Sequence, residues 1–229
     1  MLVTLLNCCL IIIGSIAGLT FRKVIGDKYK KVVMEAIGLC ILGLGIYQAV
    51  GAMSEDNANP LLFIVAIVFG RLLGELINLD EKINRIGMLL KSKFANDDKK
   101  FSEGFVTASI LYCVGTLTIL GAVKSGTEGD DSILLVKSVL DGITSVFLAA
   151  SFGIGVVFSI VPVLIIQGGI VIFSSFVSHY ITPDMLRELS VIGGLILVAI
   201  GLVILEIRKL KISNYIPALI VPVIYYLIF

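Results

Sequence analysis

Apolar residues form long runs along this chain, and short polar or charged connections separate them. A helix needs about 20 apolar residues to cross the hydrocarbon core of a bilayer, and most of the runs approach this length. Backbone groups inside a bilayer must bond within their own segment, so such runs predict helices. Eight runs are expected, at 2–21, 32–52, 60–79, 105–123, 143–160, 161–177, 189–205 and 216–229. The pattern predicts an all-α polytopic transmembrane bundle.

The division between the fifth and sixth runs is the least obvious, because no charged residue lies between Asp141 and His179. Pro162 is the expected turn. Basic residues gather on the cytoplasmic side of membrane proteins, and 14 of the 18 lysines and arginines lie in the connections 22–31, 80–104 and 206–213. Eight spans place all three connections on one side, whereas seven would separate them. We therefore expect eight spans with both termini outside.

One connection is long enough to form an element of its own. Residues 80–104 separate three predicted membrane helices (1–79) from the remaining ones (105–229), within one membrane domain. Apolar residues recur in this connection at helical spacing, which predicts an amphipathic helix on the membrane surface. They are Ile83, Ile86, Leu90 and Phe94. A linker is the favoured interpretation, and a partner-binding surface is the alternative.

Composition agrees with this class and excludes others. The chain is 58% hydrophobic and 15% charged, with a mean hydropathy of +1.06, so it has too little polar surface for a soluble globule. A net charge of +1 argues against nucleic-acid binding. One histidine and four cysteines within apolar runs give no metal or redox spacing, and no enzyme motif is present, so we expect no cofactor. Gly14-x-x-x-Gly18 indicates close helix packing, within the chain or in a homodimer.

Two stretches resemble each other at an offset of 38 residues. Glu103-Gly104 and Asp141-Gly142 each precede an apolar run with small polar residues at matching places. A second match, at an offset of 156, relates Gly38 and Gly45 to glycines near the C-terminus. Both comparisons relate runs that would cross the membrane in opposite directions, so they predict inverted repeats of the kind that secondary transporters use.

Charged residues inside the apolar runs are few, and such residues mark functional sites in membrane proteins. Lys137 and Asp141 lie one helical turn apart at the expected outer approach to the fifth run. Because Asp141 precedes the expected helix start, it fits either a helix cap or a cation site. Glu103 holds the matching place on the cytoplasmic side. Arg71 and Glu75 have the same spacing as Lys137 and Asp141 and are expected to form an ion pair.

Polar side chains deep in the runs complete the candidate path, because a polar group in hydrocarbon needs a partner. Gln167-Gly168-Gly169 interrupts the sixth run, and it predicts either a locally unwound segment or an interhelical hydrogen bond from Gln167. The path candidates within the runs are Asn7, Ser109, Cys113, Ser145, Ser151 and Gln167, together with Gly168 beside Gln167.

Several blocks occur in an order that resembles an uncharacterised bacterial inner-membrane family, the one that includes YqgA and YdfK. The blocks are Leu6-Asn7, 105–109 leading into 113–115, 137–143, Gln167-Gly168 and 193–195. The resemblance covers essentially the whole chain. It implies a polytopic membrane protein with a transport-related role, and it implies no particular substrate.

Together these features favour a membrane transporter or channel for a small ion or small polar solute. The residues expected to line the path are Asp141, Ser109, Ser145, Ser151 and Gln167. Lys137 would serve as the tethered counter-ion of Asp141 when no substrate cation is bound. The alternative is a membrane scaffold or assembly factor that binds partners through residues 80–104. No catalytic residue is expected in either case.

Overall fold

The computed structural model describes residues 1–24, 27–55, 58–83, 85, 100–113 and 116–228, and the elements of this part are helical. The α-helices are α1 (Leu2–Val24), α2 (Asp27–Met53), α3 (Pro60–Leu76), α5 (Phe101–Cys113), α6 (Thr116–Thr127), α7 (Ser132–Phe152), α8 (Ile160–Ile172), α9 (Ser174–Val177), α10 (Pro183–Ile204) and α11 (Ile220–Ile228). Two 3-10 helices, η1 (Ile154–Ser159) and η2 (Ile212–Leu219), precede α8 and α11.

Within the described ranges, five helical segments are long and apolar enough to cross a membrane. The number becomes six if α5 and α6, which meet at an angle of 55°, form one bent span. Each of the eight predicted runs contains a helix, but α3 and the segment Ile212–Ile228 are short for a full span. The all-helical membrane fold is confirmed, and eight complete spans are slightly more than the helix lengths support.

The helices form two compact units that do not follow chain order. Unit 1 comprises Met1–Met34, Asn84–Cys113 and Leu117–Ser178, and therefore contains α1 and α5 to α9. Unit 2 comprises Glu35–Ile83, Val114–Thr116 and His179–Phe229, with most of α2, α3, α10 and α11. Each unit thus takes helices from both sides of the connection 80–104.

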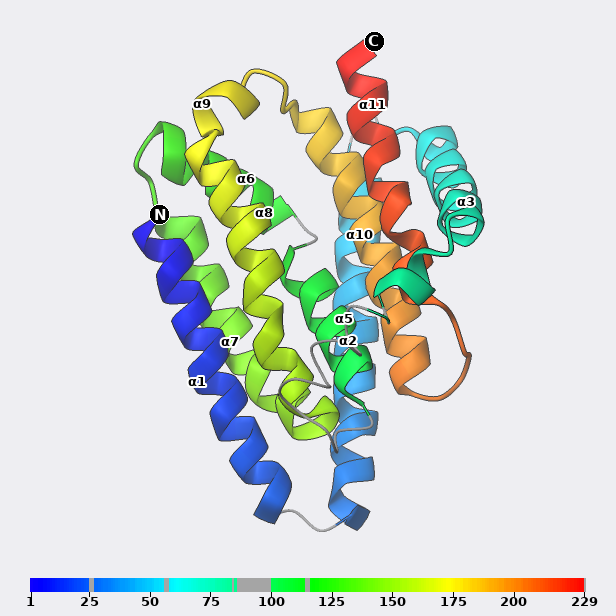
Figure 1. Ribbon diagram of the computed structural model, residues 1–229. Coiled ribbons are helices and arrows are strands. Elements are labelled where there is room, and N and C mark those ends of the chain that lie inside the picture. The colour runs from blue at the N-terminus through cyan, green and yellow to red at the C-terminus, as the bar shows by residue number, and fades with distance from the viewer. Residues whose placement is uncertain (25–26, 56–57, 84, 86–99, 114–115, 229) are drawn as a thin grey trace. The chain divides into compact units, whose positions relative to one another are not determined.

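In unit 1, α1 packs along α7 and also contacts α8 (Figure 1). Gly14 lies against Gly142, and Gly18 lies against Val146, so α1 and α7 run in the same direction. Gly168 of α8 instead faces Met1 and Thr4 at the start of α1.

Further along α1, the thiol of Cys8 reaches the carbonyl of Ile160 at the start of α8. Because α8 is therefore antiparallel to α1, α7 and α8 are two separate passes, as the eight-run pattern predicts.

The boundaries of the fifth and sixth helices differ from the prediction. α7 begins at Ser132, so the expected helix start at Asp141-Gly142 is wrong. The segment before Asp141 is itself apolar except for Lys137, and the two charges neutralise each other one turn apart. The turn expected at Pro162 is also wrong. The chain turns at Gly153, whose φ of 85° suits glycine, while Pro162 fits the first turn of α8.

Unit 2 is built on a close contact between α2 and α10. Gly45 packs against Gly194, while Leu42 lies against Gly201 further along, so these helices are antiparallel. An eight-span chain orients its second and seventh runs oppositely, whereas a seven-span chain would orient them alike. The contact therefore favours the eight-run topology.

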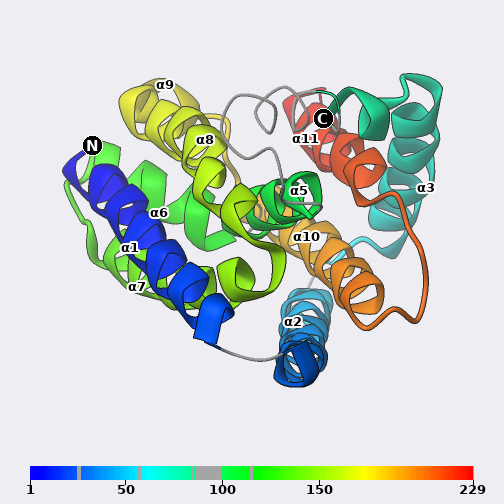
Figure 2. The ribbon, with the colours of Figure 1, turned by 60° about the horizontal axis from the view of Figure 1, so that its bottom comes forward.

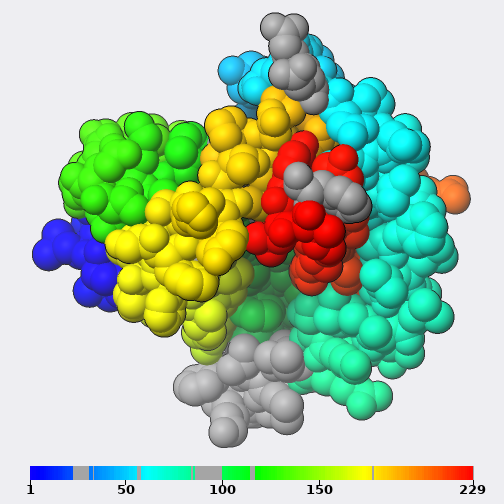
Figure 3. All heavy atoms as spheres, turned by 90° about the horizontal axis from the view of Figure 1, so that it is seen from above, coloured from blue at the N-terminus to red at the C-terminus, as the bar shows by residue number. Residues whose placement is uncertain are grey.

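The remaining helices of unit 2 pack together through α3. α3 lies beside α11 (Figure 2), and the two meet on the face seen from above, where α11 is red and α3 cyan to teal (Figure 3). Gly70 and Gly74 of α3 allow this approach because they lie against the backbone of η2 at Ala218 and Asn214. Pro60 begins α3, and Pro217 lies inside η2.

The connection 80–104 lies mostly outside the described residues. Of its four predicted apolar positions, only Ile83 falls within the described ranges, so the amphipathic helix stays a prediction. The inverted repeat also stays a prediction.

Candidate functional site

The candidate site begins with the contact between α1 and α7. A Cβ atom on Gly14 would overlap the carbonyl oxygen of Gly142, and one on Gly18 would overlap that of Val146. These glycines therefore let the two backbones touch. Asn7 lies two turns before Gly14 on the same face of α1, so the contact brings Asn7 against Asp141.

Asp141 is the centre of a buried polar network that joins α1, α7 and α8. Its Oδ2 atom accepts hydrogen bonds from Lys137 Nζ and from Asn7 Nδ2, the latter at 3.0 Å. Asn7 Nδ2 also donates to Gln167 Oε1 at 3.1 Å, and Gln167 Nε2 donates to Thr4 Oγ1 at 3.3 Å. Five polar side chains from three helices thus form one continuous chain of contacts.

The network is sealed from the surface in this conformation. Asn7 and Gln167 are fully buried, while Lys137 and Asp141 are 5% and 7% exposed. Asp141 is the tenth residue of the 21-residue α7, which places the carboxylate near the middle of the helix. The expected position at the outer approach to the membrane is therefore wrong, and a helix-capping role is excluded.

A second layer connects the network to α5. Ser145 Oγ donates to the Asp141 carbonyl at 2.6 Å and shares a 2.7 Å hydrogen bond with the buried hydroxyl of Tyr112. Tyr112 lies in the last turn of α5, and its carbonyl accepts a hydrogen bond from Thr118 of α6 at 3.0 Å. The bend between α5 and α6 thus lies next to the polar network.

One buried acceptor of the network is unused. Among the described residues, Asn7 Oδ1 has no hydrogen-bond partner, although Asn7 is fully buried. An unsatisfied buried polar atom costs about 1–3 kcal/mol. The site can therefore accept a further donor or a cation.

The ion pair gives the first testable prediction. We expect Lys137→Met to lower the free energy of unfolding by about 3–5 kcal/mol, because it leaves the Asp141 carboxylate buried without its counter-charge. The double variant Lys137→Met/Asp141→Leu should recover most of the loss. Denaturant unfolding in detergent micelles measures both, with Lys124→Met as the control at a partly exposed lysine. Equal losses in the single and double variants would contradict this interpretation.

The structure does not gather all the predicted path residues at this site. Ser109 bonds within its own helix to the Phe105 carbonyl, and Ser151 Oγ is buried without a partner among the described residues. Cys113, by contrast, is buried at the end of α5 next to Tyr112, within electrostatic range of Lys137 and Asp141. Glu103 is exposed in the first turn of α5, so its predicted equivalence to the mid-helix Asp141 is wrong.

Gln167 and Gly168 lie within an unbroken stretch of α8, so the predicted unwinding there is wrong. The alternative, an interhelical hydrogen bond from Gln167, is confirmed. Gly168 is buried, and a Cβ atom there would lie 3.6 Å from the Met1 side chain and 3.7 Å from that of Thr4. A Cβ atom at this position would fit, so the approach of α8 to α1 does not require a glycine here.

The second predicted ion pair forms a separate cluster in unit 2. Arg71 Nη1 and Glu75 Oε2 lie 2.6 Å apart, which confirms the predicted pairing. Lys211 Nζ and Asn214 Nδ2 also contact the Glu75 carboxylate, each at 2.9 Å. Hydrogen bonding to Glu75 raises the pKa of Lys211 above its ordinary value. The cluster is partly exposed, as expected for an interfacial ion pair.

Sequence reasoning missed Thr4 and Tyr112 at the site, and it missed the buried Arg187 and Glu188 of unit 2. Thr4 had a detectable signal, since it lies one turn before Asn7 on the same helical face. Arg187 lies before the predicted run 189–205, but α10 begins at Pro183 and includes it. Within the described residues, no three His, Cys, Asp or Glu side chains come together as a metal site would require.

Known proteins resemble this chain over most of its length. It is 38% identical over 219 residues to the uncharacterized membrane protein YdfK of Bacillus subtilis (strain 168), covering 96% of this chain and 93% of YdfK. It is 31% identical over 219 residues to the uncharacterized protein YqgA of Escherichia coli (strain K12), covering 93% and 91%.

A more distant relative comes from Methanospirillum hungatei JF-1 and carries the name "Putative manganese efflux pump MntP". Its identity is 28% over 182 residues, covering 76% of this chain and 91% of the relative. No solved structure matches the chain. The family model described as "Protein of unknown function (DUF554)" matches residues 2–227. The chain therefore belongs to the DUF554 family of membrane proteins.

Proposed function

We propose that this protein transports a small cation across the membrane through the polar network of unit 1. The observation that carries the proposal is the buried carboxylate of Asp141, which is paired with a lysine from its own helix and accepts a hydrogen bond from the amide of Asn7. The side-chain oxygens of Asn7, Gln167 and Thr4 would help to replace the hydration shell of the cation.

A purely structural role explains this arrangement less well. Charged groups in the middle of a membrane helix are costly, and a buried ion pair often stabilises a protein no more than apolar residues of the same volume. Lys137 places an ammonium group where a substrate cation would bind. We interpret it as a tethered counter-ion that moves aside when a cation enters.

The oxygen atoms of the site indicate the class of substrate. One carboxylate, two amides and a hydroxyl are hard ligands, which suit alkali, alkaline-earth and manganese ions better than soft metals. The name of the Methanospirillum relative refers to manganese efflux, which supports a cation as the substrate here and makes Mn²⁺ one of the ions to test.

The bend between α5 and α6 adds a second argument. Secondary transporters often use discontinuous helices beside a site near the midplane, because the broken ends supply polar groups and can move. α5 and α6 meet at 55°, and Tyr112 ties the end of α5 to Ser145 and thus to the helix that carries Asp141. A movement of α5 would open or close the network.

The proposal is tested in proteoliposomes that contain an ion indicator. Na⁺, K⁺, Mg²⁺ and Mn²⁺ are added outside in turn, and uptake is compared with protein-free vesicles. We expect at least one cation to enter at a rate that saturates with its concentration. Folded protein that carries none of these ions faster than the bare lipid would overturn the proposal.

A further inference from the structure

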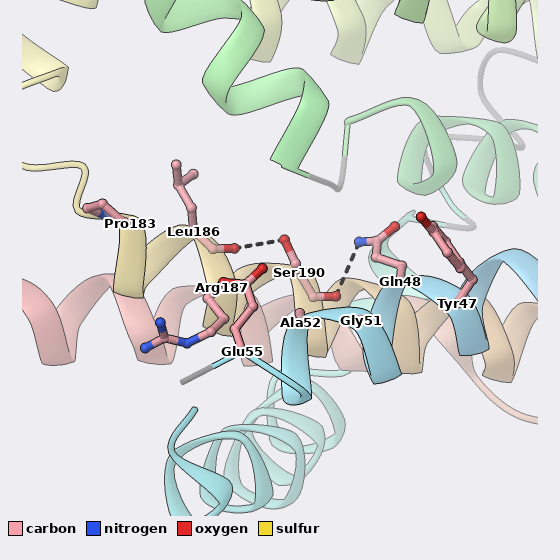
Figure 4. A pocket seen from close by; sticks show the side chains of 9 residues that line it. All are labelled: Tyr47, Gln48, Gly51, Ala52, Glu55, Pro183, Leu186, Arg187 and Ser190. Carbon is pink, nitrogen blue, oxygen red and sulfur yellow. Dashed lines mark hydrogen bonds between the residues drawn. The ribbon is translucent and has the colours of Figure 1, made fainter. Parts of the chain in front are cut away.

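Unit 2 contains a cavity that is independent of the Asp141 network. It lies between the C-terminal turns of α2 and the first turns of α10 and has a volume of about 360 Å³ (Figure 4). This volume is in the range of small-molecule sites and far exceeds that of a bare ion. The polar side chains that line it are Tyr47, Gln48, Glu55, Arg187 and Ser190.

One wall of the cavity is formed where α2 and α10 are in close contact. Gly45 and Gly194 hold the α2 and α10 backbones in contact, and Gln48 Nε2 donates a hydrogen bond to the Ser190 carbonyl at 3.2 Å (Figure 4). Gly51 lies between Gln48 and Glu55 on the same side of α2, and a Cβ atom there would meet nothing within 4 Å. The surface of α2 at Gly51 is therefore open, and the cavity extends along α2 past this residue.

Glu55 is the carboxylate and Arg187 the guanidinium among the residues that line the cavity. Arg187 is buried, and its Nη2 atom lies 2.7 Å from Asp184 Oδ1, so an acid already balances this cation. The neighbouring Glu188 is fully buried and accepts a hydrogen bond from Asn59 N at 2.9 Å. Its Oε2 atom has no hydrogen-bond partner in the described part of the chain. Asp184 and Glu188 are not lining residues, so the lining carries the Glu55 carboxylate and an Arg187 guanidinium that Asp184 already neutralises.

The lining also has a distinct order along α2. Glu55 and Tyr47 are eight residues apart, which corresponds to ~12 Å along a helix. The carboxylate thus marks one end of the cavity and the aromatic ring the other, with Gly51 and the apolar Leu186 between them. An aromatic ring attracts a cation on its face as a carboxylate attracts one directly.

We propose that this cavity binds an extended aliphatic diamine or polyamine. One ammonium group lies at Glu55, the methylene chain passes over Gly51 and along Leu186, and the second ammonium group meets the Tyr47 ring. The Glu55 carboxylate and the face of the Tyr47 ring each suit one of the two positive charges. The inference does not depend on cation transport through unit 1.

The test uses 1,6-hexanediamine and calorimetric titration of the purified full-length protein. We expect saturable binding to the wild type, about tenfold weaker binding to Glu55→Gln, and no detectable binding to Gly51→Leu, whose side chain fills the cavity. Gly43→Leu is the matched control, because Gly43 is also on α2, has nothing within 4 Å and does not line the cavity. It should bind like the wild type.

Two further ligands separate amine recognition from other effects. 1,6-Hexanediol has the same chain length without charge and should not bind, and Mg²⁺ should not displace the diamine. Asp141→Asn should retain diamine binding, because it changes the other unit. The proposal is overturned if the wild type shows no binding up to about 10 mM, if Glu55→Gln or Gly51→Leu binds as well as the wild type, or if Mg²⁺ competes fully.

Discussion

Replacing Asp141 by asparagine should lower the initial rate of cation uptake by about a hundredfold. Interactions with a charged group are worth about 1.5–3 kcal/mol, and each 1.4 kcal/mol corresponds to a factor of ten in rate. The amide can still accept the hydrogen bond from Asn7, but it cannot neutralise a cation. The rate is measured in proteoliposomes with the cation that the wild type carries.

Loss of uptake in Asp141→Asn must be separated from loss of folding, because the variant leaves Lys137 buried without its counter-charge. The double variant Lys137→Gln/Asp141→Asn removes both charges and should be folded but inactive. Asp130→Asn is the matched control on the connection before α7. The hydrogen bonds from Ser132 hold the pKa of Asp130 below its ordinary value. Asp130 is therefore ionised at neutral pH, and the control also removes one negative charge. Wild-type uptake by the double variant would remove Asp141 from the mechanism.

The second large effect is expected at the contact between α1 and α7. Gly14→Ala should lower the free energy of unfolding by about 1–3 kcal/mol or more, because the added Cβ atom overlaps the Gly142 carbonyl oxygen and forces the backbones apart. The same movement would separate Asn7 from Asp141, so cation uptake should fall as well. Denaturant unfolding in micelles measures the change in stability.

Gly169→Ala is the control for this prediction. Gly169 lies in α8 of the same unit, and a Cβ atom there meets nothing within 4 Å. Its unfolding free energy should stay unchanged or rise slightly, since alanine suits a helix better than glycine. A stability of Gly14→Ala equal to that of Gly169→Ala would show that the close backbone contact is not required.

The fold class could be predicted because the length and composition of apolar runs follow directly from bilayer thickness. The separation of α7 from α8 was also predictable in outline. Its position was not, because Gly153 and Pro162 are both plausible breaks and only tertiary structure selects one. The start of α7 was missed because Lys137 and Asp141 reduce local hydropathy, although their pairing allows them to lie inside the helix.

The candidate site was predictable residue by residue but not as an assembly. Spacing alone identified the Lys137 and Asp141 pair, and a glutamine in an apolar run marked Gln167 as a residue that needs a partner. The identity of that partner depends on how α1 is placed against α7 and α8. Gly14 and Gly18 were recognised as packing residues, but a glycine pattern does not specify which helix it faces.

The most direct test of the account is whether water reaches the buried network of unit 1. Cys113 is 8% exposed at the end of α5, so a water-soluble reagent can reach it only if the structure opens. The measurement uses a variant that keeps Cys113 and replaces Cys8, Cys9 and Cys40 by alanine, treated in vesicles with a charged thiol reagent. Asp130→Cys in a background without Cys113 gives the rate for a partly exposed position.

We predict that Cys113 reacts in the folded protein, more slowly than the cysteine at position 130, and that the transported cation protects it. Reaction of Cys113 only after unfolding would mean that the network stays dry, and it would contradict a cation path through Asp141.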